Sequence, residues 1–271
     1  MAITIQELNI YPLKSARGIP QTRVRLAATG FEWDRHWMVI RDDGTFLTQR
    51  THPLLTRIVT ELTGDGLLLT AAGFEPLVLP FAPRGAGRPV RIWKDDCQGL
   101  DQGDEAAAWV SRVLGEPVRI VRTPAAPDRR ASPEFAGPHP SPIAFPDGYP
   151  ILVCNRTSLD DLNGRLPEAL PMERFRPSLV VDGLSPFEED RIASLEIGPV
   201  VLTLVKPCTR CIIPSTDQRT GIRGFDPLPV LRTFRFDRKL LGVTFGENAV
   251  ITRGVGEFLE RGAPCQVTYD N

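Results

Sequence analysis

The chain has 271 residues, of which 42% are hydrophobic and 24% are charged, and its formal net charge is -1 at pH 7. This length can bury one large core or form two domains. The near balance of charge excludes a protein-wide basic field for nucleic acid or membranes, so any anion site must be a local cluster. No apolar run is long enough to span a membrane, and Ile3 and Ile5 begin a strand-like alternation where a signal peptide would differ. We therefore expect a soluble, cytoplasmic protein.

The chain has five cysteines, an odd number, and Cys97, Cys154 and Cys265 are isolated in the sequence. This spacing does not resemble the disulfide framework of a small secreted domain. We therefore expect the thiols to be reduced.

The first half of the chain predicts short strands separated by turns. Residues 37–40 and 45–48 flank Asp43-Gly44, a dipeptide that permits the backbone of a tight hairpin. Further apolar or β-branched strands are predicted at residues 67–70, 76–79, 90–93 and 118–121. One helix is expected between Asp104, a candidate cap, and Gly115, because the apolar residues between them share a helical face.

The second half repeats this pattern after a proline-rich stretch at residues 124–150, which is expected to be a linker or a covering loop. A strand at residues 151–154 and a helix capped near Thr157 are predicted to follow it. More strands are predicted at residues 179–181, 195–197, 200–205, 249–252 and 266–269. The expected fold is mainly β with a few short helices (α+β), divided into β-rich domains at residues 1–122 and 123–271.

Two thiols and a guanidinium follow an apolar run in the segment Lys206-Pro207-Cys208-Thr209-Arg210-Cys211. Thiolates bind soft metals, and arginine matches the geometry of phosphate and oxo-anions. A redox dithiol is disfavoured because no helix is expected to follow, and a zinc site lacks two further ligands at a recognisable spacing. Two buried thiols at the end of a strand remain an open alternative, although Arg210 disfavours a purely apolar core there.

Other basic residues lie in loops that could meet the same anion. Lys14 and Ser15 follow the first predicted strand, and their cation and hydroxyl could hold a phosphate. Arg35 stands at the start of a strand, where an exposed ion pair is an equally good interpretation. Arg176 precedes Pro177, and we expect an extended conformation for it, because a following proline disfavours the helical region.

Six short segments carry a family resemblance and are, in order, Tyr11 to Ser15, Asp34 to Trp37, Asp147 to Pro150, Phe175 to Pro177, Lys206 to Cys211, and Phe245-Gly246. In their order and spacing the chain resembles MOSC-domain proteins, the family related to the C-terminal domain of molybdenum cofactor sulfurase. Within it, the likeness is to bacterial YcbX-like proteins and mitochondrial amidoxime reducing components, and it covers nearly the whole chain. The resemblance implies an N-terminal MOSC-type β-barrel domain followed by a MOSC β-barrel.

The resemblance also implies a cofactor, molybdenum held by a pterin with a terminal phosphate. Cys211 then matches the protein's thiolate ligand to the metal and is the catalytic and metal-binding candidate. The candidates for contacts to the pterin and its phosphate are Lys14, Ser15, Arg35, Ser158, Arg176, Ser178, Cys208, Thr209 and Arg210. Ser178 and Pro214 depart from the residues usual in relatives, and Cys208 matches a position that does not bind the metal.

The activity implied is an oxidoreductase that reduces N-hydroxylated compounds such as amidoximes, hydroxylamines and N-hydroxylated nucleobases, a detoxification role. Electrons are expected from a separate flavoprotein, ferredoxin or flavodoxin, because no iron–sulfur cluster is expected in this chain, and neither nucleic acid nor membrane is expected as a partner. Family descriptions also associate these domains with pyridoxal phosphate. Two alternatives stay open, a non-catalytic carrier of the molybdenum cofactor or of sulfur on Cys211, and an interaction module with structural or zinc-binding cysteines.

Overall fold

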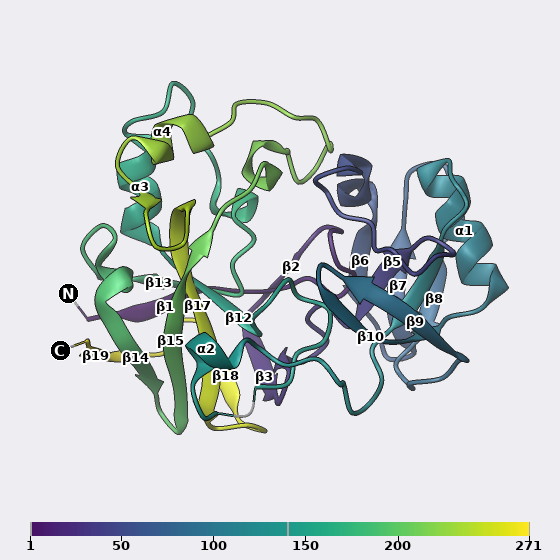
Figure 1. Ribbon diagram of the computed structural model, residues 1–271, viewed down its shortest axis with the longest axis horizontal. Coiled ribbons are helices and arrows are strands. Elements are labelled where there is room, and N and C mark those ends of the chain that lie inside the picture. The colour runs from purple at the N-terminus through teal and green to yellow at the C-terminus, as the bar shows by residue number, and fades with distance from the viewer. Residues whose placement is uncertain (1, 140, 271) are drawn as a thin grey trace.

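A computed structural model describes residues 2–139 and 141–270. Strands dominate it, and the helices are few and short, so the predicted mainly β fold is confirmed. Two β-rich units lie side by side along the long axis of the molecule (Figure 1). Among the residues that the structure describes, no helix combines the length and the apolar character needed to cross a membrane.

The first unit is built on a nine-stranded sheet. Its strand order is β19 (Gln266–Tyr269), β14 (Ile192–Ile197), β15 (Val200–Thr209), β17 (Gly242–Arg253), β12 (Ile151–Asn155), β13 (Leu179–Asp182), β1 (Thr4–Ile10) and β2 (Ile19–Gln21), and β16 (Phe236–Asp237) pairs with β17. The helices of this unit are α3 (Arg156–Asn163), η2 (Met172–Arg174), η3 (Glu188–Arg191), η4 (Ile213–Ser215) and α4 (Leu228–Arg232). All six strands predicted after residue 150 form, most of them longer than expected.

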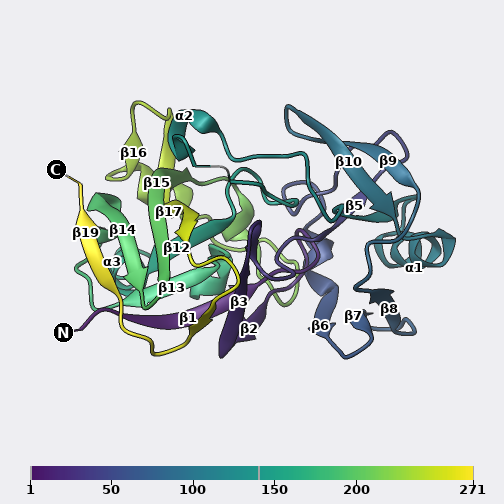
Figure 2. The same cartoon turned by 90° about the horizontal axis from the view of Figure 1, so that it is seen from below.

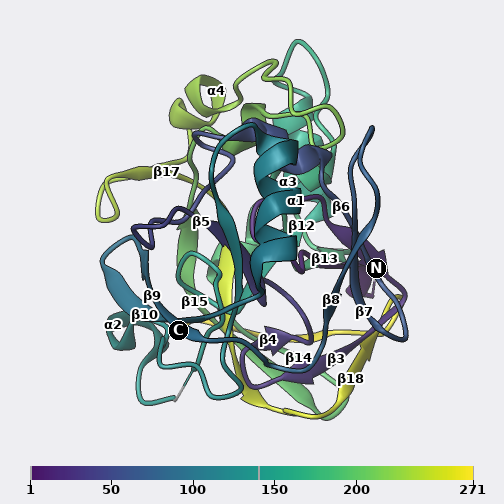
Figure 3. The ribbon, with the colours of Figure 1, turned by 90° about the vertical axis from the view of Figure 1, so that its right-hand side faces the viewer.

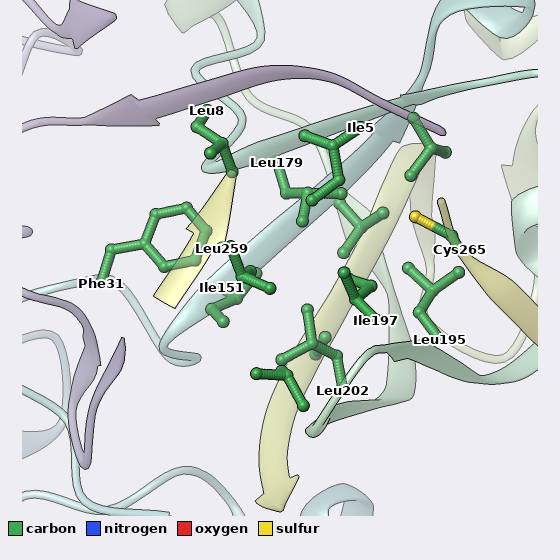
Figure 4. Close-up of a cluster of buried hydrophobic side chains, with 14 of the residues drawn as sticks. Ile5, Leu8, Phe31, Ile151, Leu179, Leu195, Ile197, Leu202, Leu259 and Cys265 are labelled. Atoms are coloured by element: carbon green, nitrogen blue, oxygen red, sulfur yellow. The ribbon is translucent and has the colours of Figure 1, made fainter. Parts of the chain in front are cut away.

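The core of this sheet contains side chains from both ends of the chain. Ile5 and Leu8 of β1 pack in one cluster with Leu179, Leu202 and residues of β12 and β14 (Figure 4). A small sheet of β18 (Phe258–Glu260), β3 (Arg23–Ala27) and β4 (Gly30–Phe31) adds Leu259 and Phe31 to the same cluster. Residues of β1, β3 and β4 therefore share a core with strands of the second half, and the predicted division at residue 122 stays a prediction.

The second unit contains two small sheets and one long helix. One sheet has the order β5 (Trp37–Ile40), β11 (Arg119–Arg122), β10 (Asp95–Asp101) and β9 (Gly87–Ile92), and the other has β6 (Val59–Leu62), β7 (Gly66–Thr70) and β8 (Leu77–Pro80). Helix α1 (Asp104–Leu114) packs Trp109 and Val110 into their shared core and lies in front of the strands in Figure 3. The short helix η1 (Pro53–Arg57) completes the unit.

Two local predictions in this unit need correction. The expected strand at residues 45–48 makes only a single bridge to β5, because the chain turns back on itself when the amides of Thr51 and His52 donate to the carbonyl of Thr48. Helix α1 forms and ends at Gly115 with φ of 76°, as predicted, but its cap position is Gly103 and no side chain caps it. In the first unit, the helix predicted near Thr157 forms as α3, and the side chain of Asn155 caps it by accepting a hydrogen bond from the amide of Thr157.

The proline-rich segment runs from the second unit back to the first, where it forms α2 (Pro133–Ala136), as Figure 2 shows. Arg129 holds its far end in place. The buried guanidinium of this residue donates to the carbonyls of Ala144 at 3.0 Å and Pro146 at 2.8 Å, and it pairs with Asp95 at 2.9 Å. These contacts of Arg129 hold the backbone of residues 144–147 in place. A segment held against the protein in this way is consistent with the expected covering loop.

Gly246 in β17 allows two central strands to approach closely. Its φ is +74°, and a Cβ added there would lie 2.6 Å from Cys154 Sγ and 2.7 Å from the carbonyl oxygen of Val153. Only glycine meets both the conformational and the steric demand of this position.

We predict that Gly246→Ala lowers the free energy of unfolding by about 2 to 4 kcal/mol, through left-handed strain and the clash with β12. Urea denaturation of the purified protein measures this loss. The matched control is Gly64→Ala, where an added Cβ meets nothing within 4 Å. Equal midpoints for the two variants would contradict the packing argument.

Candidate functional site

A pocket opens where the loops of the two units meet. It brings together nine of the ten predicted site residues, namely Lys14, Ser15, Arg35, Arg176, Ser178, Cys208, Thr209, Arg210 and Cys211. These residues come from loops after β1 and before β5 and β13, and from the end of β15. The interpretation that these segments face one common ligand is therefore geometrically consistent.

Ser158 is the predicted residue that the structure does not bring to this pocket. Its side chain is fully buried near the start of α3, where the hydroxyl donates to Glu189 Oε2 at 2.7 Å and accepts from the amide of Phe187 at 2.7 Å. Both hydrogen-bonding roles of the hydroxyl are used within the fold, so Ser158 supports the buried carboxyl of Glu189.

Cys208 lies near the end of β15 and Cys211 two residues beyond that strand; both are half-buried and are not part of a disulfide in the described residues. Arg210 lies between them, and its guanidinium donates to the carbonyl of Phe175 at 2.7 Å and contacts Cys208 Sγ at 3.1 Å. Burial acts to lower the pKa of Arg210, but the neighbouring thiols, Cys208 foremost, outweigh it and raise that pKa. The Nε atom of Arg210 is buried and has no hydrogen-bond partner in the described part of the chain.

Arg35 and Arg176 lie on the ring of Tyr11, with guanidinium carbons 4.3 Å and 4.2 Å from its centroid. Arg35 also pairs with the buried carboxylate of Asp34. Arg176 donates to the carbonyl of Ala16 at 2.8 Å, and burial lowers its pKa to about 10. An anion in the pocket would favour the charged form of both arginines.

Three of the site residues have strained backbones. Ser15, Arg35 and Arg176 have φ of 69°, 52° and 56°, in the left-handed region that residues other than glycine seldom adopt. The predicted extended conformation of Arg176 is therefore wrong. Its side chain is held by Tyr11 and by acceptors on two loops, which outweighs the preference set by Pro177. Strain of this kind tends to gather at functional sites, where the surrounding fold holds it in place.

Sequence reasoning missed two charged residues of the pocket, Arg50 and Asp147. The carboxylate of Asp147 accepts from Lys14 Nζ at 2.6 Å and from Arg50 at 2.9 Å. Burial lowers the pKa of Lys14 to about 8, although Asp147 opposes the shift. Burial would raise the pKa of Asp147, but Lys14 and Arg50 hold it well below its usual range. Asp147 lies in a segment that supported the family resemblance, whereas no motif marks Arg50.

The pocket therefore combines a thiol with an excess of positive charge. Five cationic residues line it, namely Lys14, Arg35, Arg50, Arg176 and Arg210. In the part of the chain that the structure describes, Asp147 and Asp34 are the carboxylates paired with them, which leaves three positive charges unmatched. A phosphate group carries about -1.5 to -2 at neutral pH and would remove most of this excess. The site is suited to an anionic ligand that also presents a soft metal to a thiolate.

The fold and site define a class of protein, a two-part β protein with a cationic, thiol-containing pocket. Residues 2–117 match the MOSC N-terminal beta barrel domain, and residues 140–265 match the MOSC domain. The chain belongs to the MOSC domain family, as the sequence resemblance predicted.

Two relatives show the extent of the similarity. The chain is 36% identical over 245 residues to mitochondrial amidoxime reducing component 2 of Bos taurus, covering 86% of this chain and 72% of that protein. It is 33% identical over 267 residues to mitochondrial amidoxime-reducing component 1 of Homo sapiens, covering 92% of this chain and 78% of that protein. In both cases the similarity spans both domains.

One buried carboxyl lies directly behind the pocket. Glu247 in β17 precedes Asn248, a lining residue, and it is only 4% exposed. Its Oε1 atom has no hydrogen-bond partner in the described residues. Burial, together with the nearby carboxyls of Asp190 and Glu189, raises the pKa of Glu247 to about 9. The folded protein thus keeps this group neutral at pH 7, at a cost to its stability.

We predict that Glu247→Gln makes the protein more stable, and increasingly so as the pH rises from 5 to 8. Between pH 4.5 and about 9 the folded wild type holds a proton that the unfolded chain releases, so its stability falls with rising pH. The contribution of this residue is about 1.4 kcal/mol per pH unit. Urea denaturation across this range measures it, with the exposed Glu257→Gln as control. Parallel profiles for wild type and Glu247→Gln would refute the raised pKa.

Proposed function

We propose that this pocket binds a molybdenum–pterin cofactor and that the protein is an oxidoreductase that reduces N-hydroxylated compounds. The observation that carries the proposal is the convergence of Cys211 with Lys14, Arg35, Arg176 and Arg210 in one pocket. The relatives named mitochondrial amidoxime reducing components support the reaction class.

The residues present fit such a cofactor. Cys211 is the proposed thiolate ligand to the metal, because it lies at the pocket wall just beyond the last strand residue, Thr209. The unpartnered Nε of Arg210 and the guanidinium groups of Arg35 and Arg176 are proposed to bind the anionic parts of the pterin. Lys14 and Ser15 are proposed to bind the phosphate group of the pterin. Ser178 and Cys208 line the same wall.

The proposed reaction consumes an N–OH group, two electrons and two protons, and it yields N–H and water. When bound, the molybdenum cofactor supplies the two-electron chemistry of this reduction. The protein chain would bind and orient the cofactor. Arg35 and Arg176 are already fixed by the Tyr11 ring and by backbone carbonyls, so little reorganisation is needed when an anion binds. The electrons are proposed to come from a separate donor protein.

We predict that Cys211→Ala loses bound molybdenum and turnover, whereas Cys208→Ala keeps the metal. Only Cys211 is assigned to the metal, since Cys208 is engaged with Arg210. Both variants are made in a host that synthesises the pterin, and molybdenum is measured per chain by elemental analysis. Turnover of an amidoxime is followed with an artificial reductant. Equal metal loss in the two variants would overturn the assignment.

Two outcomes of the same measurements favour the alternatives. Molybdenum-loaded wild type without turnover would point to a carrier of the cofactor. Zinc in place of molybdenum would point to a structural or interaction role for the cysteines.

We also predict that Arg35→Ala and Arg176→Ala each weaken retention of the cofactor by about 1.5 to 3 kcal/mol, because each removes a charge-assisted contact. The measurement is the pterin content after dialysis, with thermal unfolding to verify the fold. The control is Arg156→Ala, since this arginine forms an exposed pair with Asp160 on α3. Retention equal to that of the control would show that Arg35 and Arg176 do not contact the cofactor.

A further inference from the structure

The loop at residues 216–227, between η4 and α4 of the first unit, lies against η1 of the second unit beside the pocket. Arginine side chains connect this loop to η1, to the segment before η1 and to the loop after β1. Arg17 donates to the carbonyl of Arg219 at 2.8 Å, Arg57 donates to that of Thr220 at 3.0 Å, and Arg223 donates to the carbonyl of Arg50. All three bind backbone carbonyls, and none forms an ion pair within residues 2–139 and 141–270. Their positive charge is therefore not neutralised.

Exposed apolar side chains lie among these charges. Leu54 of η1 is 42% exposed, and Ile222 of the loop is 63% exposed. The basic rim is defined here as Arg17, Leu54, Arg57, Arg219, Ile222 and Arg223. Arginine is enriched at protein–protein interfaces, and the exposed apolar side chains beside it offer surface that a partner can bury.

The basic rim adjoins the pocket. Arg50 lines the pocket and accepts the hydrogen bond from Arg223, while Ile213 of the loop's preceding helix η4 also lines it. Acidic groups also lie nearby, and Glu7, Glu173 and Asp217 line a second pocket together with Arg219. Asp217 pairs with Arg174 at 3.2 Å, and Glu173 reaches Arg219 only at 3.9 Å, where the arginine side chain is 78% exposed. In a chain of net charge -1, this local positive excess is a distinct feature.

We infer that the basic rim is the docking surface for a small acidic electron-carrier protein that supplies the pocket. This inference rests on the proposed function. Reduction of one N–OH group takes two electrons, so two reduced one-electron carriers are oxidised in turn, and two protons come from water. Charge complementarity speeds the encounter of such partners, and electron-transfer interfaces are small and short-lived. A mixed rim of arginine and aliphatic side chains beside the site fits that kind of contact.

The test compares two reductants with the cofactor-loaded protein. The first is an acidic [2Fe–2S] ferredoxin kept reduced, and the second is a neutral sulfonatopropyl viologen that needs no docking surface. Arg219→Glu is expected to lower kcat/KM for the ferredoxin at least tenfold at low salt and to leave the viologen rate unchanged. The wild-type ferredoxin rate should fall with rising salt, and the variant should show a weaker dependence.

Two further variants separate charge from structure. Arg191→Glu makes the same charge change just before β14, which lies at the left of Figure 1, whereas β6, the strand after η1, lies in the right half, and this variant should behave like wild type. Arg57→Lys keeps the charge while altering the contact to Thr220, so it should retain most of the ferredoxin rate.

An unchanged kcat/KM for ferredoxin in Arg219→Glu would overturn the inference. So would Arg191→Glu losing as much as Arg219→Glu, or wild-type binding to phosphatidylserine vesicles or duplex DNA in preference to the ferredoxin. Absence of turnover with the viologen would refute the proposed function separately. Titration of the protein with ferredoxin then still tests whether the basic rim is a docking surface. Binding by the wild type that Arg219→Glu abolishes would support docking, and an absence of binding by the wild type would reject it.

Discussion

The antiparallel pairing of β1 with β13 is the constraint on which the site depends. Leu8 lies opposite Leu179, so the end of β1 lies next to the start of β13. The amide of Asn9 donates to the carbonyl of Ser178 at 2.8 Å, and the Tyr11 hydroxyl donates to that of Pro177 at 3.0 Å. The loop after β1 and the loop before β13 are thereby held together, although about 160 residues separate them in the chain.

Pairing between neighbouring strands brings further residues to the pocket. Thr209 at the end of β15 pairs with Thr244 near the start of β17, and β12 begins level with the segment before β13. Strands held in register in this way bring residues of different loops together without any need for the loops to be long. The sheet supplies a rigid base, and the chemistry lies in the connections.

Burying the positive charges of the pocket costs free energy, and nearby hydrogen-bond acceptors offset part of that cost. A buried guanidinium is unfavourable unless its donors find acceptors. Arg176 uses the carbonyl of Ala16 and the face of Tyr11, and Arg210 uses the carbonyl of Phe175. Neutral acceptors satisfy the hydrogen bonds but leave the charge in place. The pocket is thus pre-organised for an anion, and an anion that binds there will also stabilise the folded state.

Local sequence signals predicted most of the strands, and nine of the ten residues that local signals and the family resemblance proposed for the site line one pocket. Local signals did not predict the features that depend on contacts between residues far apart in the sequence. Ser158 resembled a ligand contact, but its position at the start of α3 turns it toward Glu189. Arg50 belongs to no motif, and its partner Asp147 is 97 residues away. The left-handed backbone of Arg176 likewise depends on acceptors on distant loops.

Arg50 shows how the two units form one functional surface. Its guanidinium pairs with Asp147 inside the pocket and lies 4.6 Å from the centre of the exposed Trp93 ring, while its carbonyl accepts from Arg223 of the rim. Asp147 in turn is placed by Arg129, which binds the carbonyls of its segment. One connected set of contacts therefore runs from the basic rim to Lys14 at the pocket wall. A partner that displaces Arg223 from Arg50 would act on the pocket through a single residue, so docking and ligand binding are expected to be energetically coupled.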